Sequence, residues 1–207
     1  MRGPMVRAAL RIVVFELKGL LAIGQWIIRR RDGVPDGATV VTYTKAQTFM
    51  LSLMLFAMVV ETVVVDLLLV ALDVPAWLRF AVLIADVYGL LFGVMLAAAC
   101  ATRPHVITPD ELRIRFGVYF DVRVPVERIV AVRASRNYNE SGMVIVKDGR
   151  LSVAVSSQTN VTVELSEPVA FVRPFGSRGE ATSIRFFADE PEKVVAALRT
   201  DRTAEAA

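Results

Sequence analysis

Two long apolar runs separated by four residues constrain this chain more than any other feature of its sequence. Residues 47–72 and 77–101 are 26 and 25 residues long, and each run carries two charged side chains. About 20 mostly apolar residues in a helix cross a bilayer core about 30 Å thick. The short link forces the two helices antiparallel, and Pro75 within it ends the first. The sequence therefore predicts a transmembrane helical hairpin over residues 47–102.

The alternative is a pair of buried helices in the core of a soluble protein. The chain has 207 residues, and 55% of them are apolar, which is above the usual range for soluble domains. Outside the two runs too little chain remains to cover both helices on all sides. Membrane insertion is the favoured interpretation.

Cations flank the hairpin on the side of its two open ends. Lys and Arg concentrate in the cytoplasmic segments next to membrane spans, which predicts both termini in the cytoplasm and a multi-pass protein of the plasma membrane. Only Arg79 lies near the link between the runs. The flanking cations are Arg29, Arg30, Arg31 and Lys45 before the first run, and Arg103, Arg113 and Arg115 after the second.

Small residues recur every fourth position along the second run. Such a stripe lets another helix backbone approach closely, and close packing is the main source of association energy between helices in lipid. The partner helix could be the first run, a second copy of the chain, or a different protein. The stripe consists of Ala81, Ala85, Gly89, Gly93, Ala97 and Ala101.

Three carboxylates lie inside the two runs. Counted from the outer helix ends, Glu61 and Asp86 are each roughly 14–17 Å deep, near the bilayer midplane, and Asp66 is nearer the outer surface. Charges at such depth are costly and usually functional. They predict a proton or cation relay, a docking point for a basic residue of a partner helix, or protonated carboxyls that hydrogen-bond between helices.

Residues 1–32 are expected to form an amphipathic helix that lies in the membrane interface. Five polar side chains fall within a sector of about 40° around the helix axis, which suits a helix lying in the plane of the lipid headgroups. They are Arg7, Arg11, Lys18, Gln25 and Arg29. A third span and a helix packed on the cytosolic domain are the alternatives. The expected headgroup contacts are Arg7, Arg11, Lys18, Arg29, Arg30 and Arg31.

Basic residues concentrate at the start of the chain. Residues 1–48 hold 8 Lys or Arg against 3 Asp or Glu, whereas residues 103–207 hold 15 against 14. A nucleic-acid-binding surface needs clustered cations. The near-neutral C-terminal part therefore argues against a nucleic-acid partner.

A small β-rich domain is expected over residues 103–200, after a loop at 33–46 and before a disordered tail at 201–207. Apolar and polar residues alternate with a period of two from Leu112 onward, and Asp148-Gly149 is a tight-turn signal. A closing helix is expected at 192–199, capped by Asp189. The predicted fold class is α+β: a transmembrane hairpin plus a small antiparallel β barrel or sandwich. The expected strands are 112–116, 118–124, 129–132, 143–146, 151–155, 161–165, 169–172 and 183–187.

Residues 106–117 and 124–129 resemble the opening of bacterial pleckstrin-homology-like domains, with a threonine–x–acid–x–leucine strand, a glycine, and a proline–x–x–x–isoleucine segment. The whole chain is similar to small actinobacterial integral membrane proteins of unknown function. The resemblance implies a split barrel capped by the C-terminal helix, and it implies no enzymatic activity. It transfers no binding residues to this chain.

No catalytic, metal or cofactor site is expected. His105 and Cys100 are the single histidine and cysteine, and they lack the third group that orients a nucleophile and its base. We expect His105 at the membrane interface. The favoured function is a non-enzymatic membrane-anchored adaptor or accessory subunit that engages another membrane protein or a second copy. The alternatives are a component of proton- or ion-coupled transport and a sensor of anionic lipid.

Overall fold

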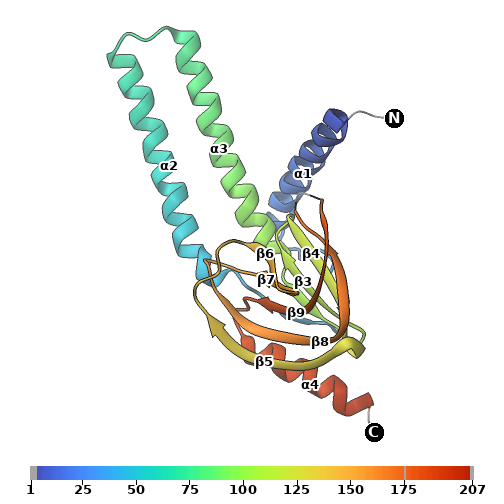
Figure 1. Ribbon diagram of the computed structural model, residues 1–207. Coiled ribbons are helices and arrows are strands. Elements are labelled where there is room, and N and C mark those ends of the chain that lie inside the picture. Colours follow the sequence, from blue (N-terminus) through green and yellow to red (C-terminus); the bar gives the residue numbers. More distant parts are fainter. Residues whose placement is uncertain (1–3, 175, 206–207) are drawn as a thin grey trace.

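The structure is a computed structural model. It describes the backbone of residues 4–174 and 176–205, and the side chains of residues 13–174 and 176–199. Its class is α+β, as predicted: two long apolar helices, then two sheets and a C-terminal helix. Figure 1 shows the helical pair projecting from one side of the β domain.

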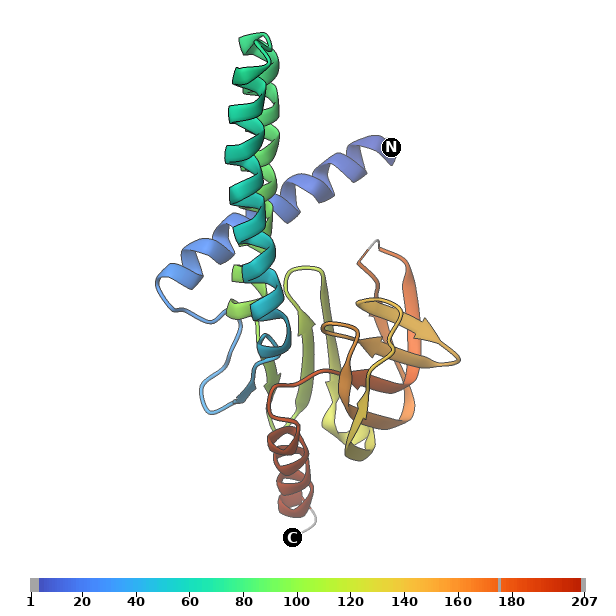
Figure 2. The same cartoon turned by 90° about the vertical axis from the view of Figure 1, so that its left-hand side faces the viewer.

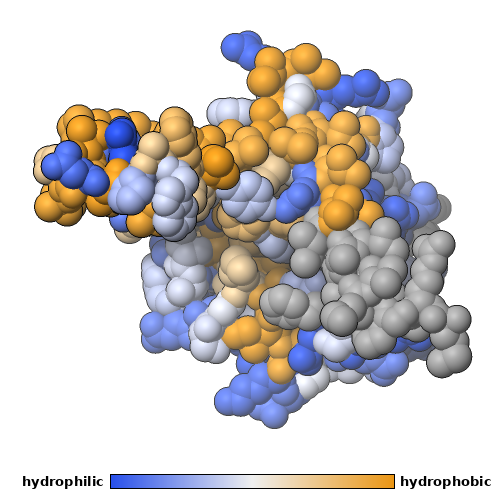
Figure 3. Space-filling view, turned by 90° about the horizontal axis from the view of Figure 1, so that it is seen from above, coloured by the Kyte–Doolittle hydropathy of each residue, from blue (hydrophilic) through white to orange (hydrophobic). Residues whose placement is uncertain are grey.

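The predicted hairpin is confirmed as a pair of helices. Helix α2 (Lys45–Ala71) and helix α3 (Ala76–Thr102) are both long and apolar enough to cross a membrane. Asp73 takes a left-handed backbone in the link, with φ of 52°, and Pro75 lies at the start of α3. No residue of α2, which is described along its whole length, is buried. Seen from above, the hairpin surface is mostly apolar (Figure 3).

Helix α1 (Pro4–Ile27) crosses the lower half of the hairpin obliquely (Figure 2). It packs on α3 through small residues, because Ala22 is buried against Ala98 and Ala99. A side chain at Gly19 would place its Cβ 2.8 Å from the sulfur of Met95. Among the described helices, α1 does not join α2 and α3 as a candidate span.

The first sheet pairs the segment before the hairpin with the segment after it, since β1 precedes α2 and β2 follows α3. Its order is β1-β2-β3-β4, antiparallel throughout. The expected loop at 33–46 is wrong in part, because Thr39–Val41 forms strand β1 and pairs with β2 (His105–Ile107). The predicted strands at 112–116 and 118–124 are confirmed as β3 (Glu111–Phe116) and β4 (Phe120–Pro125), with Gly117 at φ of 51° in the turn between them.

The second sheet departs from the predicted all-antiparallel arrangement. Its order is β5-β8-β9-β7-β6, and β7 pairs with β9 in parallel. The expected strands 161–165 and 169–172 merge into the long β8. Its register against β9 shifts between Glu164 and Val169, because Pro168 cannot donate a ladder hydrogen bond. After the 3-10 turn η1 (Val126–Arg128), the strands are β5 (Ile129–Asn137), β6 (Val144–Lys147), β7 (Arg150–Val153), β8 (Thr159–Val172) and β9 (Arg178–Phe186).

Helix α4 (Pro191–Glu205) closes the domain. Val194 and Leu198 are buried in the same apolar core as the inward residues of both sheets. The helix runs into the expected disordered tail, since its turns continue from 201 to Glu205. Residues 206 and 207 lie outside the described chain.

Candidate functional site

The carboxylates within the hairpin lie in two different environments. Asp66 accepts a hydrogen bond of 3.1 Å from the Arg79 guanidinium across the two helices. Asp86 lines the same narrow gap between α2 and α3, together with Thr62. Glu61 instead lies on the exposed surface of α2, and no ion pair among the described side chains involves it. The structure therefore groups Asp66, Arg79 and Asp86 but separates Glu61 from them.

Glycines of the small-residue stripe pack inside the hairpin. A Cβ built at Gly93 would lie 2.6 Å from Cδ2 of Leu55, and one built at Gly89 would lie 3.2 Å from Cε of Met58. Both glycines therefore face α2. Ala81 and Ala85 are exposed. Ala97 is half-buried.

This division follows from helix geometry. Residues four apart differ by about 40° around the helix axis, so a stripe at every fourth position drifts around the helix. The part of the stripe free to meet another helix is the outer end, at Ala81 and Ala85.

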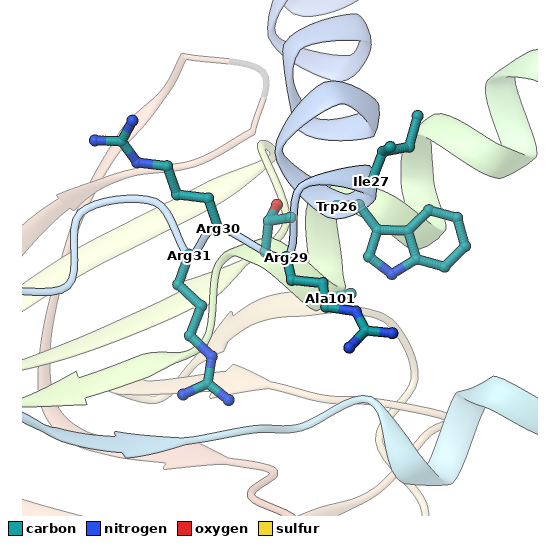
Figure 4. Close-up of a pocket in the computed structure, with 7 residues that line it drawn as sticks. Trp26, Ile27, Arg29, Arg30, Arg31 and Ala101 are labelled. Carbon is teal, nitrogen blue, oxygen red and sulfur yellow. The ribbon is translucent and has the colours of Figure 1, made fainter.

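The cations expected at headgroups are only partly described. The side chains of Arg7 and Arg11 lie outside the described residues, whereas Lys18 and the three arginines at 29–31 are exposed. The three arginines and Trp26 line a cavity of about 540 Å³ beside Ala101 (Figure 4). Their guanidinium groups point in different directions in that view, so they do not converge on one point.

Arg29 ends helix α1 in a conformation that normally suits glycine. Its φ is 56°, its N–H donates to the carbonyl of Trp26, and the N–H of Arg30 donates to Gln25. This is the Schellman arrangement, in which glycine usually occupies the left-handed position. A cation here complements the negative end of the helix dipole.

Glu16 of α1 has a partner that the sequence did not reveal. It accepts a hydrogen bond from the Tyr88 hydroxyl of α3. Phe15 packs beside it against Phe92 of α3 and Tyr119 of the β3–β4 turn, with ring centroids 6.1 and 4.9 Å apart. These contacts fasten α1 to both the hairpin and the β domain.

A buried polar junction holds the β domain to the base of the hairpin. His105 is 1% exposed, so the expectation of an interfacial histidine is wrong. Its Nδ1 accepts the N–H of Arg115, and its Nε2 therefore donates to the carbonyl of Phe187 at 2.9 Å. The ring stacks on Tyr43, with centroids 4.6 Å apart. Burial lowers the pKa of His105 to about 4, which keeps the ring neutral.

Tyr43 and Arg115 complete this junction. The Tyr43 hydroxyl accepts the N–H of Gly117 at 2.7 Å, and burial raises its pKa. The side chain of Arg115 is buried under the chain that follows α1. It donates to the carbonyls of Asp32 and Gly33 at 2.7 and 2.8 Å.

Asp189 connects the C-terminal helix to the hairpin. Its carboxylate oxygens accept the N–H groups of Thr44 and Lys45 at 3.1 and 3.0 Å. It was expected to cap the helix at 192–199, but it caps α2 instead, because β1 and the C-terminal segment lie side by side: the N–H of Asp189 donates to Thr42. Sequence separation hides this contact from any local reading of the chain.

The described residues offer no metal centre: no three His, Cys, Asp or Glu side chains lie close enough together to hold an ion. Comparison of the chain with models of protein families, with curated proteins and with solved structures finds no match.

Proposed function

We propose that this chain is a non-enzymatic membrane-anchored adaptor or accessory subunit that engages another membrane protein. Helices α2 and α3 span the plasma membrane, and both termini and the β domain lie in the cytoplasm. The exposed position of Glu61 on the apolar surface of α2 is the observation that carries the proposal. A charged side chain at the bilayer centre costs at least about 2.5 kcal/mol.

Within the hairpin, Asp66 illustrates how this cost is avoided, because Arg79 neutralises it at 3.1 Å. Glu61 has no such partner among the described side chains. A basic or hydrogen-bonding residue on a partner helix would serve Glu61 as Arg79 serves Asp66. A second copy of this chain is the simplest alternative occupant of that face.

The outer end of α3 supplies a smooth surface for the same partner. Ala81 and Ala85 are exposed, and small residues allow close helix approach in lipid. The β domain is the part that would reach a cytosolic ligand. Its pleckstrin-homology-like identity remains part of the proposal: the closing helix α4 supports it, whereas the parallel pairing of β7 and β9 does not.

The adaptor proposal is tested by replacing Ala85 with leucine and purifying the chain from its native membrane in a mild detergent. A stoichiometric partner should co-purify with the wild-type chain, and Ala85→Leu should reduce its recovery at least severalfold. Ile84→Leu changes a neighbouring exposed residue without changing bulk, and it should leave recovery unchanged. If the purified assembly has the same mass for Ala85→Leu as for Ile84→Leu, the proposal is contradicted.

A second candidate function is a component of proton- or ion-coupled transport. The grouping of Asp66, Arg79 and Asp86 between the helices favours it. The gap that they line leaves no room for a water molecule, so a relay would need another conformation or further subunits. Asp86→Asn should then abolish transport while assembly persists. Normal transport by a cell carrying that substitution would exclude this candidate.

A further inference from the structure

A second cavity, distinct from the one beside Trp26, lies between helix α1 and the β domain. Its volume is about 580 Å³. Figure 2 shows α1 extending above the domain, with the turn between β3 and β4 rising toward it from below. The cavity therefore lies on the side of the domain from which the helices project.

Three cations from distant parts of the chain line this cavity: Lys18 of α1, Arg103 after α3, and Arg173 directly after β8. Asp121 is the carboxylate in the lining, and Arg113 already neutralises it at 2.9 Å. Arg103 is paired in turn with Asp32.

Lys18 and Arg173 remain, since no described carboxylate forms an ion pair with either side chain. With each existing ion pair counted as neutral, the cavity keeps a net charge of about +2. These groups suit an oxyanion.

The rest of the lining is apolar. Phe15 and Tyr119 pack against each other with ring centroids 4.9 Å apart and ring planes tilted by 46°. Val14, Val118 and Val172 also line the cavity, and Val172 is 55% exposed. A free inorganic anion would use the cations and leave this surface in water. An anionic amphiphile would cover both.

We propose that this cavity binds an anionic phospholipid of the inner leaflet. The phosphate lies between Lys18, Arg103 and Arg173, and the acyl chains run along the apolar side of α1. The proposal rests on the membrane insertion of α2 and α3 proposed above, because insertion places the base of the hairpin, and with it this cavity, at the depth of the headgroups. The cavity beside Trp26 is less suited, because its arginines do not converge (Figure 4).

The test uses the full chain reconstituted in nanodiscs of phosphatidylcholine, with and without phosphatidylglycerol. Native mass spectrometry then counts the lipids that stay bound on release from the disc. We expect retention of one phosphatidylglycerol in preference to phosphatidylcholine. Each cation near a headgroup contributes about 1 kcal/mol, or roughly fivefold in affinity, so Lys18→Gln with Arg173→Gln should weaken retention roughly thirtyfold.

Arg178→Gln is the matched control, because Arg178 is exposed on the same β8–β9 hairpin but does not line the cavity. It should retain the lipid like the wild-type chain. If Arg178→Gln loses as much bound lipid as the double variant, diffuse electrostatic attraction holds the lipid and the proposed site is overturned. Lys18 and Arg173 are exposed, so the double variant should fold, and its thermal unfolding checks this.

Two further measurements complete the test. One distinguishes a lipid phosphate from free inorganic phosphate as the bound group, and the other reports whether the chain is inserted in the membrane. Inorganic phosphate should not displace the retained lipid at concentrations that saturate a simple anion site, and displacement would overturn the lipid assignment in favour of a free phosphate. Alkaline carbonate extraction of native membranes reports insertion separately. A chain that stays in the membrane but retains no anionic lipid overturns this inference alone. A chain that is extracted overturns the insertion on which both proposals rest.

Discussion

At the scale of single residues, Asp189 has a stabilising role that can be measured directly. Its carboxylate accepts two of the free N–H groups at the start of α2. Replacing a capping carboxylate with alanine costs about 0.5–2 kcal/mol, and we expect Asp189→Ala to lower the free energy of unfolding within that range. Denaturant unfolding in detergent micelles measures the change.

Glu190→Gln is the control for Asp189, because Glu190 is exposed and its pair with Lys45 spans 4.0 Å. Exposed pairs of this kind contribute little. A loss for Glu190→Gln as large as that for Asp189→Ala would mean that general charge, rather than the cap, stabilises the start of α2.

The burial of His105 makes the free energy of unfolding of this chain depend on pH. Burial lowers its pKa to about 4 in the folded state, from an ordinary 6.5. Between these values the unfolded chain binds the extra proton, so the histidine's contribution is complete above pH 6.5 and is lost as the pH falls to 4. The slope is about 1.4 kcal/mol per pH unit, which gives a total of about 3.5 kcal/mol over this window.

The measurement compares the free energy of unfolding of the wild-type chain and of His105→Gln over this pH range. Their difference should shrink toward acid pH, because glutamine does not titrate. As His105 is the single histidine of the chain, its NMR signal also reports its charge without assignment. A folded-state histidine that titrates near pH 6.5 would contradict the buried, neutral ring.

At the scale of elements, the α2–α3 contact predicts opposite results for two members of the same stripe. Gly93→Leu forces a branched side chain into the space of Leu55, whose Cδ2 already lies 2.6 Å from a built Cβ. The two helices should separate, which spin labels at the outer ends of α2 and α3 would record as a longer distance. Ala81→Leu, on the exposed surface, should leave that distance unchanged. A change confined to Ala81→Leu would reverse the assignment of the two faces.

The elements show what local sequence patterns can and cannot predict. The hairpin helices, the Gly117 and Asp148-Gly149 turns and the closing helix follow from hydropathy, period and turn chemistry, and each is present. Strand β1 was missed because three residues carry too short a pattern, and it exists through pairing with β2, some sixty residues away. The alternation around Arg115 correctly predicted a strand, but it could not reveal that the chain after α1 covers that position.

At the scale of the whole molecule, the hairpin and the β domain are joined by contacts between segments far apart in sequence. Arg115 reaches the carbonyls after α1, Asp189 caps α2, and Phe15 packs on the β3–β4 turn. The candidate lipid cavity has the same origin, because Lys18, Arg103 and Arg173 come from three separate regions. The sequence singled out Lys18 as an expected headgroup contact and Arg103 as a cation flanking the second run, but only the folded chain shows that they line one cavity with Arg173.

Hydrogen bonds from both α3 and the first sheet hold the segment that follows α1 against the β domain. Asp32 donates its N–H to the carbonyl of Thr102 at the end of α3, and Arg115 fixes the carbonyl of Asp32 from the sheet. Arg115→Gln removes the guanidinium that spans both carbonyls, so the segment after α1 should open more often. Hydrogen exchange at the Asp32 amide should accelerate by roughly tenfold or more, as expected for the loss of about 1.5 kcal/mol from charge-assisted hydrogen bonds. Arg123→Gln, on the exposed face of β4, should not change it. Unchanged exchange in Arg115→Gln would mean that the ion pair of Arg103 with Asp32 is sufficient to hold α1 to the domain.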